Sequence, residues 1–575
     1  MDVEDEVDGA FQGLPDVVTV EEAAAALEVS VATVRRLCAS GELQAEKAGK
    51  QWVIPRRLVE LRRPRRRPPG AAGSTSLDFV EALRHVRETD LVDHDVVLPD
   101  LLKYRDQLAD SEHLLADARL LVSGALAASG GVVVELPKSA FFTRPTVTVS
   151  LPERIAYQAA VASLAKRSDP QLPVCVYGGR VDTSKRRFLK PGVEQWLVWK
   201  TAVKKAIVEG RRWMVKTDLT AYFETIKHAT LLAAIESQNP DPIVLDALRR
   251  FLRAWAVVPG QGIPQGPNAS RFLQNLYFQP IDDEMRRGPW SYFRYMDDIR
   301  ILGRSRKEAV DGIRVLEREC RRRGLLLSAQ KTKLLEGEQA LADWEDLEVD
   351  RAQYQLDIGD HETARKQLRH LLKASIVSDR AVERRRFKFS LWRLFKLRDR
   401  EPLATVLKRL EDLAPAAQLV AVYLAPWIAS ALVEREITQF LNDEDRNISP
   451  YLEAWLMALM LDRAGQMPNA WADYARRIVR DHNQPVYLRG LAANVLSRAR
   501  QTGDLDWIRG EVRTEHDPSL LRAYSVALWR VGELDPASSA RVSSRHPLSA
   551  NCIAYLKKTS KAPSLVTSAD LLVPQ

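Results

Sequence analysis

The fold of this chain depends on one stretch, WSYFRYMDDIRIL at residues 290–302. Aromatic and β-branched residues on both sides of Asp297 and Asp298 are typical of β-strands. The pattern therefore predicts a β-hairpin whose tip carries two adjacent carboxylates. Two adjacent acids at a turn usually just cap or solvate a loop, so their meaning depends on the rest of the chain.

The composition is that of an ordinary globular protein with several domains. At 575 residues, with 46% hydrophobic and 28% charged residues, the chain should hold about three or four domains. Lys and Arg exceed Asp and Glu by 85 − 76 = 9, which is compatible with a polyanionic partner. The four cysteines lack the spacing of a zinc site or a disulfide framework.

Two features argue against a membrane or secreted protein. The acidic N-terminus is unlike a signal peptide. The longest apolar run, residues 419–433, contains Pro426 and is shorter than the roughly 20 residues that span a bilayer. We therefore expect a cytoplasmic protein with no membrane partner.

Residues 1–61 carry the pattern of a winged helix-turn-helix. Thr19 is a plausible N-cap with Glu22 at the capping-box position, and Ser30 caps a second helix that Gly41 ends. Residues 51–55 are typical of the second strand of a wing. This stretch resembles the excisionase/MerR-like DNA-binding module, whose second helix enters the major groove. The resemblance places three side chains near DNA, namely Thr33, Arg35 and Arg36. A helix-turn-helix used for protein contacts is the alternative.

Residues 62–76 have the Arg, Pro and Gly content of a linker. The arginines here are denser than a solvated face requires, which favours contact with phosphates. The candidates for that contact are Arg62, Arg63, Arg65, Arg66 and Arg67.

Farther along, residues 132–138 and 141–150 read as two strands. If these strands form a hairpin, Lys138 and Arg144 face each other across it, as two cations suited to a triphosphate. Two solvated hairpin residues are the alternative.

A second acid, Asp218, lies near the end of the apolar strand WMVKTDL at residues 213–219. One carboxylate from each of two strands is what a two-metal phosphoryl-transfer site requires, because Mg²⁺ takes oxygen ligands. An aspartate that caps the next turn is the alternative. A Gly/Pro turn at residues 262–270 then leads into a helix from Arg271 to about Met285, and residues 324–333 predict a strand that ends in lysines.

Four motifs follow one another in the order of the reverse transcriptase palm motifs. They are Asp218 with Phe223, then Pro264-Gln265-Gly266, then Tyr295-Met296-Asp297-Asp298, and then a Gly324-Leu325 strand before Lys331-Thr332. The chain thus resembles the reverse transcriptases over residues 77–347. The resemblance implies a multidomain α+β protein with a right-hand palm-and-fingers polymerase domain.

The resemblance also implies roles for individual residues. Asp218 and Asp297 match the aspartates that bind two Mg²⁺ ions, with Mn²⁺ as an alternative metal. Asp298 matches the adjacent acid that activity also needs, and the backbone carbonyl of Leu219 matches a further metal contact. Lys331 matches a lysine that donates a proton to pyrophosphate.

The residues that would bind the nucleotide follow from the same resemblance. Phe223 matches the steric gate that excludes a ribose 2′-hydroxyl, so dNTPs are the expected substrates. Gln265 and Gly266 match residues that line the nucleotide pocket. Lys138 and Arg144 match the fingers cations that hold the triphosphate.

The sequence PNASRFL at residues 267–273, with Leu276-Tyr277 and Ile281-Asp282 after it, looks like that of the bacterial abortive-infection and defence-associated (unknown group) reverse transcriptases. This resemblance implies antiphage defence and RNA-directed or template-independent DNA synthesis, which a protein tyrosine can prime. It also implies DNA or RNA as a partner and a homo-oligomer.

Residues 348–575 are helical in pattern. Similar segments begin at Pro485 and Pro518, with a looser copy at Pro450. Such repeats predict a HEAT-like α-solenoid, and the abortive-infection enzymes carry a C-terminal α-helical repeat domain.

Two alternatives remain open. A mobile-element reverse transcriptase, like those of group II introns or retrons, would copy a cognate RNA. An inactive nucleic-acid-binding regulator or scaffold would not need the three acids of the palm, which are all present in this chain.

Overall fold

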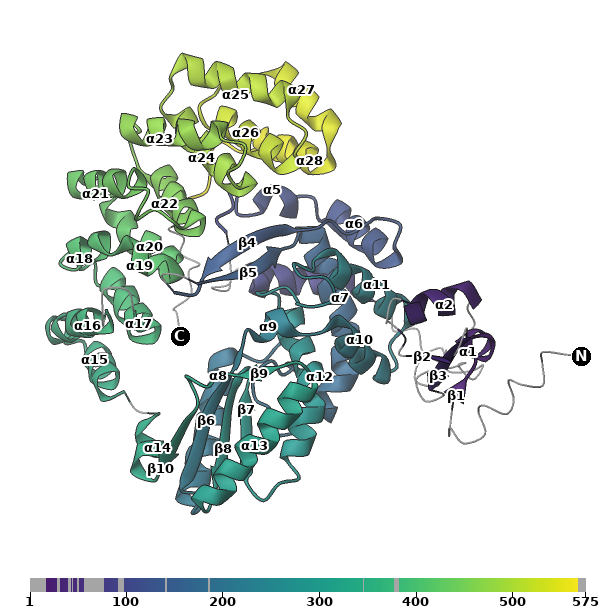
Figure 1. Ribbon diagram of the computed structural model, residues 1–575. Coiled ribbons are helices and arrows are strands. Elements are labelled where there is room, and N and C mark those ends of the chain that lie inside the picture. Colours follow the sequence, from purple (N-terminus) through teal and green to yellow (C-terminus); the bar gives the residue numbers. More distant parts are fainter. Residues whose placement is uncertain are drawn as a thin grey trace, which may run out of the picture. The chain divides into compact units, whose positions relative to one another are not determined.

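The computed structural model describes residues 17–27, 31–39, 43, 45–48, 51–55, 77–91, 98–139, 142–184, 187–344, 346–376 and 382–566. The chain divides into two units, Met1–Ser76 and Leu77–Gln575. Figure 1 shows the small first unit in purple and the second unit in blue to yellow.

The N-terminal unit has two helices and a three-stranded antiparallel sheet. The helices are α1 (Val20–Leu27) and α2 (Val31–Ala39), and the sheet has the order β1 (Val17–Val18), β3 (Gln51–Pro55), β2 (Glu46–Ala48). The predicted capping box is present, since the backbone N–H of Glu22 donates to Thr19 Oγ1 (3.2 Å) and that of Thr19 donates to Glu22 Oε2 (2.9 Å). Both predicted helices and the strand at residues 51–55 are therefore confirmed.

The centre of the second unit is a five-stranded antiparallel sheet, hereafter the central sheet. Its order is β10 (Lys333–Glu336), β6 (Trp213–Thr220), β8 (Asp298–Gly303), β7 (Ser291–Tyr295), and the short β9 (Leu326–Leu327) also pairs with β6. The predicted hairpin at residues 290–302 is confirmed as β7 and β8, with Met296 and Asp297 as its two-residue turn.

Helices cover both faces of the central sheet, which explains why β6 and β8 are apolar on both sides. Val215 and Ile301 belong to a core that also includes residues of α12 (Asn268–Met285) and α13 (Arg306–Arg322). The alternate residues Met214 and Leu302 join a second core with Trp199 from α8 (Gly192–Val208). Because side chains alternate along a strand, Asp218, Asp298 and Arg300 share the face of Met214 and Leu302.

A separate antiparallel hairpin, β4 (Val132–Pro137) and β5 (Thr143–Thr148), precedes the sheet in the chain. The other helices of this half are α4 (Phe79–His85), α5 (Arg105–Leu108), α6 (Ser111–Ser123), α7 (Leu151–Ser168), α9 (Tyr222–Thr225), α10 (His228–Ser237), α11 (Pro242–Ala254) and α14 (Glu338–Ala342). The helix expected from Arg271 begins three residues earlier, at Asn268.

From Leu347 onward the described chain is almost entirely helical (Figure 1). Its helices are α15 (Leu347–Asp357), α16 (His361–Ser375), α17 (Arg384–Lys396), α18 (Leu403–Lys408), α19 (Leu410–Leu413), α20 (Ala417–Leu424), α21 (Ala431–Leu441), α22 (Pro450–Asp462), α23 (Asn469–Arg480), α24 (Val486–Arg498), α25 (Thr502–Thr514), α26 (Pro518–Arg530), α27 (Pro536–Arg545) and α28 (Pro547–Leu556). The helices α22, α24, α26 and α28 contact one another in sequence order. Because they have neighbours on several sides, the first three bury long continuous runs of residues.

A buried ion-pair network joins this helical region to the segment before α6. Arg522 on α26 donates to both carboxylate oxygens of Asp106 (2.7 and 2.8 Å) and of Asp100 (2.8 and 2.9 Å). Although burial raises the pKa of Asp100, the charge and hydrogen bonds of Arg522 hold that pKa below its usual value. The Asp100 carboxylate thus stays charged beside the guanidinium, and the bonds of Arg522 to Asp100 and Asp106 hold the first and last parts of the second unit together.

Two expectations from the sequence were wrong in detail. The strand expected at residues 324–333 is interrupted, because the N–H groups of Lys331 and Thr332 bond back to the Ser328 carbonyl (3.2 and 3.0 Å) and form a turn between β9 and β10. Arg144 does not face Lys138 across the β4–β5 hairpin, since its partner in the register is Leu136. Lys138 lies beyond the last strand pair, in the loop.

Glu453 on α22 should make stability depend on pH. It is buried, and burial raises the pKa of its carboxyl to about 7 in spite of a hydrogen bond from the Tyr474 hydroxyl. A raised acid pKa stabilises the fold below the unfolded value near 4.5, and that stabilisation is lost as pH rises through 7.

We expect Glu453→Gln, which cannot ionise, to denature at a higher temperature than the wild type at pH 9, by a free-energy margin of about 3 kcal/mol. At pH 4, below the unfolded pKa, this advantage should be nearly absent. Thermal denaturation of both proteins from pH 4 to 9 measures the difference, with the exposed Glu444→Gln as the control. Parallel pH profiles for wild type and Glu453→Gln would contradict the assignment.

Candidate active site

The register of the central sheet places two of the predicted acids side by side. Asp218 on β6 is the direct partner of Asp298 on β8, and paired residues of antiparallel strands have side chains about 5 Å apart on one face. Asp297 directly precedes Asp298 in the chain and lies in the turn between β7 and β8. The predicted meeting of Asp218 with the Asp297-Asp298 pair therefore occurs through strand pairing.

The acids repel one another, and the repulsion changes their ionisation. Burial, followed by the charges of Asp218 and Asp298, raises the pKa of Asp297 to about 6. Burial also raises the pKa of Asp298, with an opposing effect from Arg300, whose guanidinium lies 3.6 Å away. This is a site with excess negative charge, which a cation would stabilise.

One cation of the chain already lies at this site. The Lys331 ammonium donates to Asp218 Oδ2 at 2.6 Å, from the turn between β9 and β10. The structure therefore brings all four candidate side chains of the predicted catalytic group, Asp218, Asp297, Asp298 and Lys331, to one end of the central sheet. Leu219, whose carbonyl was predicted as a further metal contact, is buried and pairs with Leu327 of β9.

The residues of the site fit a divalent cation in their chemistry. Carboxylate oxygens are the ligands that Mg²⁺ prefers, and Mg²⁺ is commonly held by one or two carboxylates together with substrate phosphates and water. Across the described part of the chain, no three His, Cys, Asp or Glu side chains converge into a preformed metal cluster. Asp218, Asp297 and Asp298 supply carboxylate oxygens, so the side chains present fit a divalent cation.

A buried ion pair, which we did not predict, holds the turn that carries Asp297. The side chains of Arg294 and Asp282 are fully buried, and Arg294 Nε and Nη2 donate to the two oxygens of Asp282 at 2.8 and 2.6 Å. Arg294 Nη1 also donates to the Met296 carbonyl at 3.0 Å. The ion pair on α12 and β7 therefore fixes the backbone next to Asp297.

The turn needs this support because Met296 has φ +55°, a conformation that costs energy for a residue other than glycine. Gln274 Nε2 contacts the Met296 sulfur at 2.8 Å. On the other side, a Cβ atom at Gly178 would lie 2.7 Å from Met296 Cγ, so only glycine leaves room for this side chain. The sequence signal for this support is Arg294 itself, an arginine inside an otherwise apolar strand.

A second group of predicted residues surrounds the loop that contains Gln265 and Gly266. Arg144 Nη1 donates to Gln265 Oε1 at 3.3 Å, and Arg144 Nε lies 3.1 Å from Glu224 Oε1. The Phe223 carbonyl accepts from the backbone N–H of Ile263 at 2.9 Å. Gly266 has φ +109°, which accounts for glycine there. The structure thus brings Arg144, Phe223 and Gln265 to one loop and adds Glu224, which we did not predict.

The other predicted binding residues make different contacts or lie outside the described residues. Lys138 is exposed, and its backbone carbonyl accepts a hydrogen bond from Arg384. In the N-terminal unit, Arg35 is exposed and lies 3.3 Å from Glu21. Thr33 and Arg36 are on α2, but their side chains are outside what the structure describes. The same is true of all five linker arginines, Arg62, Arg63, Arg65, Arg66 and Arg67.

We expect Arg294→Met to lower the free energy of unfolding by about 3–5 kcal/mol, because it leaves the Asp282 carboxylate buried without its partner. The double variant Arg294→Met/Asp282→Leu removes both charges, so its free energy of unfolding should fall less than that of Arg294→Met. Urea denaturation measures both, with the exposed Arg287→Met as the control. A single variant as stable as the control would show that the ion pair does not support this part of the fold.

No helix among the described residues is long and apolar enough to cross a bilayer.

Comparison with known proteins agrees with the geometry of the site. Residues 181–368 match the family described as reverse transcriptase (RNA-dependent DNA polymerase), a range that includes Asp218, Phe223, Gln265, Asp297 and Lys331. Residues 17–61 match a helix-turn-helix domain.

Curated relatives match only part of this chain. Protein YkfC of Escherichia coli (strain K12) is 23% identical over 35% of this chain and 60% of that protein. The group II intron-encoded protein LtrA of Lactococcus lactis subsp. cremoris is 28% identical over 22% of this chain and 23% of that protein. The chain thus spans less than two thirds of either relative. It contains a domain of the reverse transcriptase family, the RNA-directed DNA polymerases among the nucleotidyltransferases, and an N-terminal helix-turn-helix domain.

Proposed function

We propose that this protein is a DNA polymerase of the reverse transcriptase type that joins dNTPs by metal-dependent nucleotidyl transfer and acts in antiphage defence. The observation that carries the proposal is the pairing of Asp218 with Asp298, next to Asp297 at the hairpin tip. In this reaction a 3′-hydroxyl oxygen attacks the α-phosphorus of a dNTP, and the bond to pyrophosphate breaks.

Asp218 and Asp297 would hold two Mg²⁺ or Mn²⁺ ions, with Asp298 beside them and the Leu219 carbonyl as a further contact. Such ions, when bound, neutralise charge on the attacking and leaving oxygens. Burial, followed by repulsion from Asp218 and Asp298, raises the pKa of Asp297, and a bound cation would offset both effects, which supports this assignment. Lys331, now paired with Asp218, is the ammonium that would donate a proton to the leaving pyrophosphate.

The loop of Gln265 and Gly266 would form the nucleotide pocket. Arg144 is the cation best placed to bind the triphosphate, since it already contacts Gln265. Lys138, in the loop after β4, would be a second cation for the triphosphate. Phe223, attached to the same loop through its carbonyl, would exclude a 2′-hydroxyl and so select dNTPs.

The remaining parts would guide nucleic acid. Matching to a helix-turn-helix domain supports DNA or RNA contact by Thr33, Arg35 and Arg36, with the linker arginines as phosphate contacts. The domains would be the winged helix-turn-helix at 1–61, the linker at 62–76, the fingers and palm at 77–347 and the helical repeats at 348–575. The consecutive contacts of α22, α24, α26 and α28 support a HEAT-like solenoid. We also propose that the protein forms a homo-oligomer.

We expect Asp297→Asn to lower dNTP incorporation by about a hundredfold or more, because it replaces a charged oxygen ligand of the proposed metal ions with a neutral amide. Incorporation of labelled dNTPs with Mg²⁺ or Mn²⁺ measures this, with the exposed Glu236→Gln as the control. Equal thermal stability of the three proteins shows that the fold is intact. Incorporation at the wild-type rate by Asp297→Asn would reject the polymerase assignment and favour a nucleic-acid-binding scaffold.

A second candidate is a mobile-element reverse transcriptase that copies a cognate RNA, which the similarity to the group II intron-encoded protein favours. The two candidates differ in their product. A defence enzyme of the abortive-infection type would leave DNA of untemplated sequence attached to a tyrosine. A mobile-element enzyme would leave free cDNA that matches one RNA.

Tyr354 on α15 is the tyrosine that exposure favours as a primer. All fourteen tyrosines are in the described part of the chain, and Tyr354 alone is exposed there, at 60%. After complete protein digestion, we expect DNA on the peptide that contains Tyr354 and none in Tyr354→Phe, with half-buried Tyr555→Phe as the control. Free cDNA of one sequence would instead support the mobile-element enzyme.

A further inference from the structure

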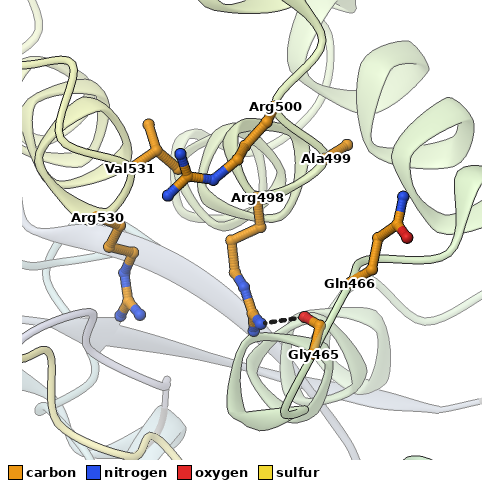
Figure 2. Close-up of a pocket in the computed structure, with 7 residues that line it drawn as sticks. All are labelled: Gly465, Gln466, Arg498, Ala499, Arg500, Arg530 and Val531. Carbon is orange, nitrogen blue, oxygen red and sulfur yellow. Dashed lines mark hydrogen bonds between the residues drawn. The ribbon is translucent and has the colours of Figure 1, made fainter.

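A pocket of about 540 Å³ lies among the C-terminal helices and belongs to no site described above. It is lined by Gly465, Gln466, Arg498, Ala499, Arg500, Arg530 and Val531. Figure 2 shows the Arg498 and Arg530 side chains extending in the same direction from neighbouring helix ends, with Arg500 above them. The volume is in the range of small-molecule sites in proteins.

The repeats of the helical region explain why arginines gather here. The helices α22, α24 and α26 each have 13 residues, and an arginine lies at or just after the C-terminal end of each. The C-terminal ends of these helices lie along one edge, because the residues just after α22 line one pocket with the ends of α24 and α26. Arg463, Arg498 and Arg530 are the three arginines at that edge.

Arg463 differs from the arginines that line the pocket. Its guanidinium lies 3.2 Å from Glu434 and also donates to carbonyls of its own loop. Within the described residues, none of Arg498, Arg500 and Arg530 forms an ion pair. The nearby Asp462 carboxylate accepts from Ser564 Oγ (2.6 Å) and from the N–H groups of Leu565 and Val566 (both 2.7 Å).

Among the three arginines that line the pocket, capping of a helix end accounts only for Arg498. Arg498 donates to the carbonyls of Leu461 (2.9 Å) and Gly465 (3.0 Å), as a cation at a helix C-terminus often does. Arg530 donates to the Leu101 carbonyl at 3.3 Å, but its Nε is buried with no hydrogen-bond partner. Arg500 has an exposed side chain and a strained backbone, with φ +56°.

The cations destabilise one another when the pocket holds no anion. Burial, followed by the charge of Arg498, lowers the pKa of Arg530 to about 10. An unpaired N–H of a buried guanidinium costs free energy unless a ligand accepts from it. Both features would be relieved by an anion with several acceptor oxygens.

We infer that this pocket binds a phosphate group through Arg498, Arg500 and Arg530. The planar guanidinium matches two phosphate oxygens at once, and charge-assisted bonds of this type are strong. The phosphate could be carried by a free nucleotide or pyrophosphate, or by a nucleic acid strand that follows the helices. The inference does not depend on polymerase activity.

The test compares two charge-matched variants of the full chain. The pocket variant is Arg500→Gln/Arg530→Gln, and the control is Arg513→Gln/Arg541→Gln, with two exposed arginines on the same helical region. Arg498 is left in place because it caps a helix. Both variants carry Asp297→Asn, so that polymerisation does not consume a probe, and isothermal titration measures pyrophosphate, dATP and a single-stranded 12-mer of DNA at constant ionic strength.

We expect the pocket variant to bind at least one probe about tenfold more weakly than the control, which is the loss of one or two charge-assisted bonds. Weaker binding of pyrophosphate and dATP with unchanged DNA binding would identify a free phosphorylated ligand. Weaker binding of DNA alone would identify a strand. Equal affinity of the two variants for all three probes would overturn the inference.

Discussion

The buried pair of Arg294 and Asp282 is the interaction on which the site depends. Both side chains are out of contact with water, so each charge is tolerated only because the other is present. The same guanidinium holds the Met296 carbonyl, and Met296 is in an unfavourable backbone conformation next to Asp297. The Arg294 side chain therefore both pairs with Asp282 in the core and fixes the backbone next to the Asp297 carboxylate.

The central sheet provides the second constraint. Its strands are covered on both faces, so their register cannot slip by one residue without placing polar side chains in one of two cores. That register pairs Asp218 directly with Asp298 on the neighbouring strand. The crowding of acids that results is unfavourable in itself, and it persists because the two cores fix the strands. Such local strain is common where a protein binds a charged ligand.

The helical region is tied to the rest of the second unit by a similar device. Arg522 forms buried ion pairs with Asp100 and Asp106. Both aspartates lie more than four hundred residues before it in the sequence. Where the arginines of this region have acidic partners, they stabilise the fold. Where they lack them, at Arg500 and Arg530, the charge is available to a ligand. The same residue type thus serves packing or binding according to its partners.

The sequence alone determined the hairpin at residues 290–302, the strand of Asp218 and the helices of the N-terminal module, because alternation, capping residues and turn residues act over a few positions. It also indicated Gln265 and Gly266 as one loop. The interrupted strand before Lys331 and the position of Lys138 were not predictable, since they depend on pairing with distant segments. Only the tertiary structure decided that Arg294 supports the acids, that Glu224 joins Arg144, and that arginines of separate helices share a pocket, because each of these requires segments that meet only when the core has formed.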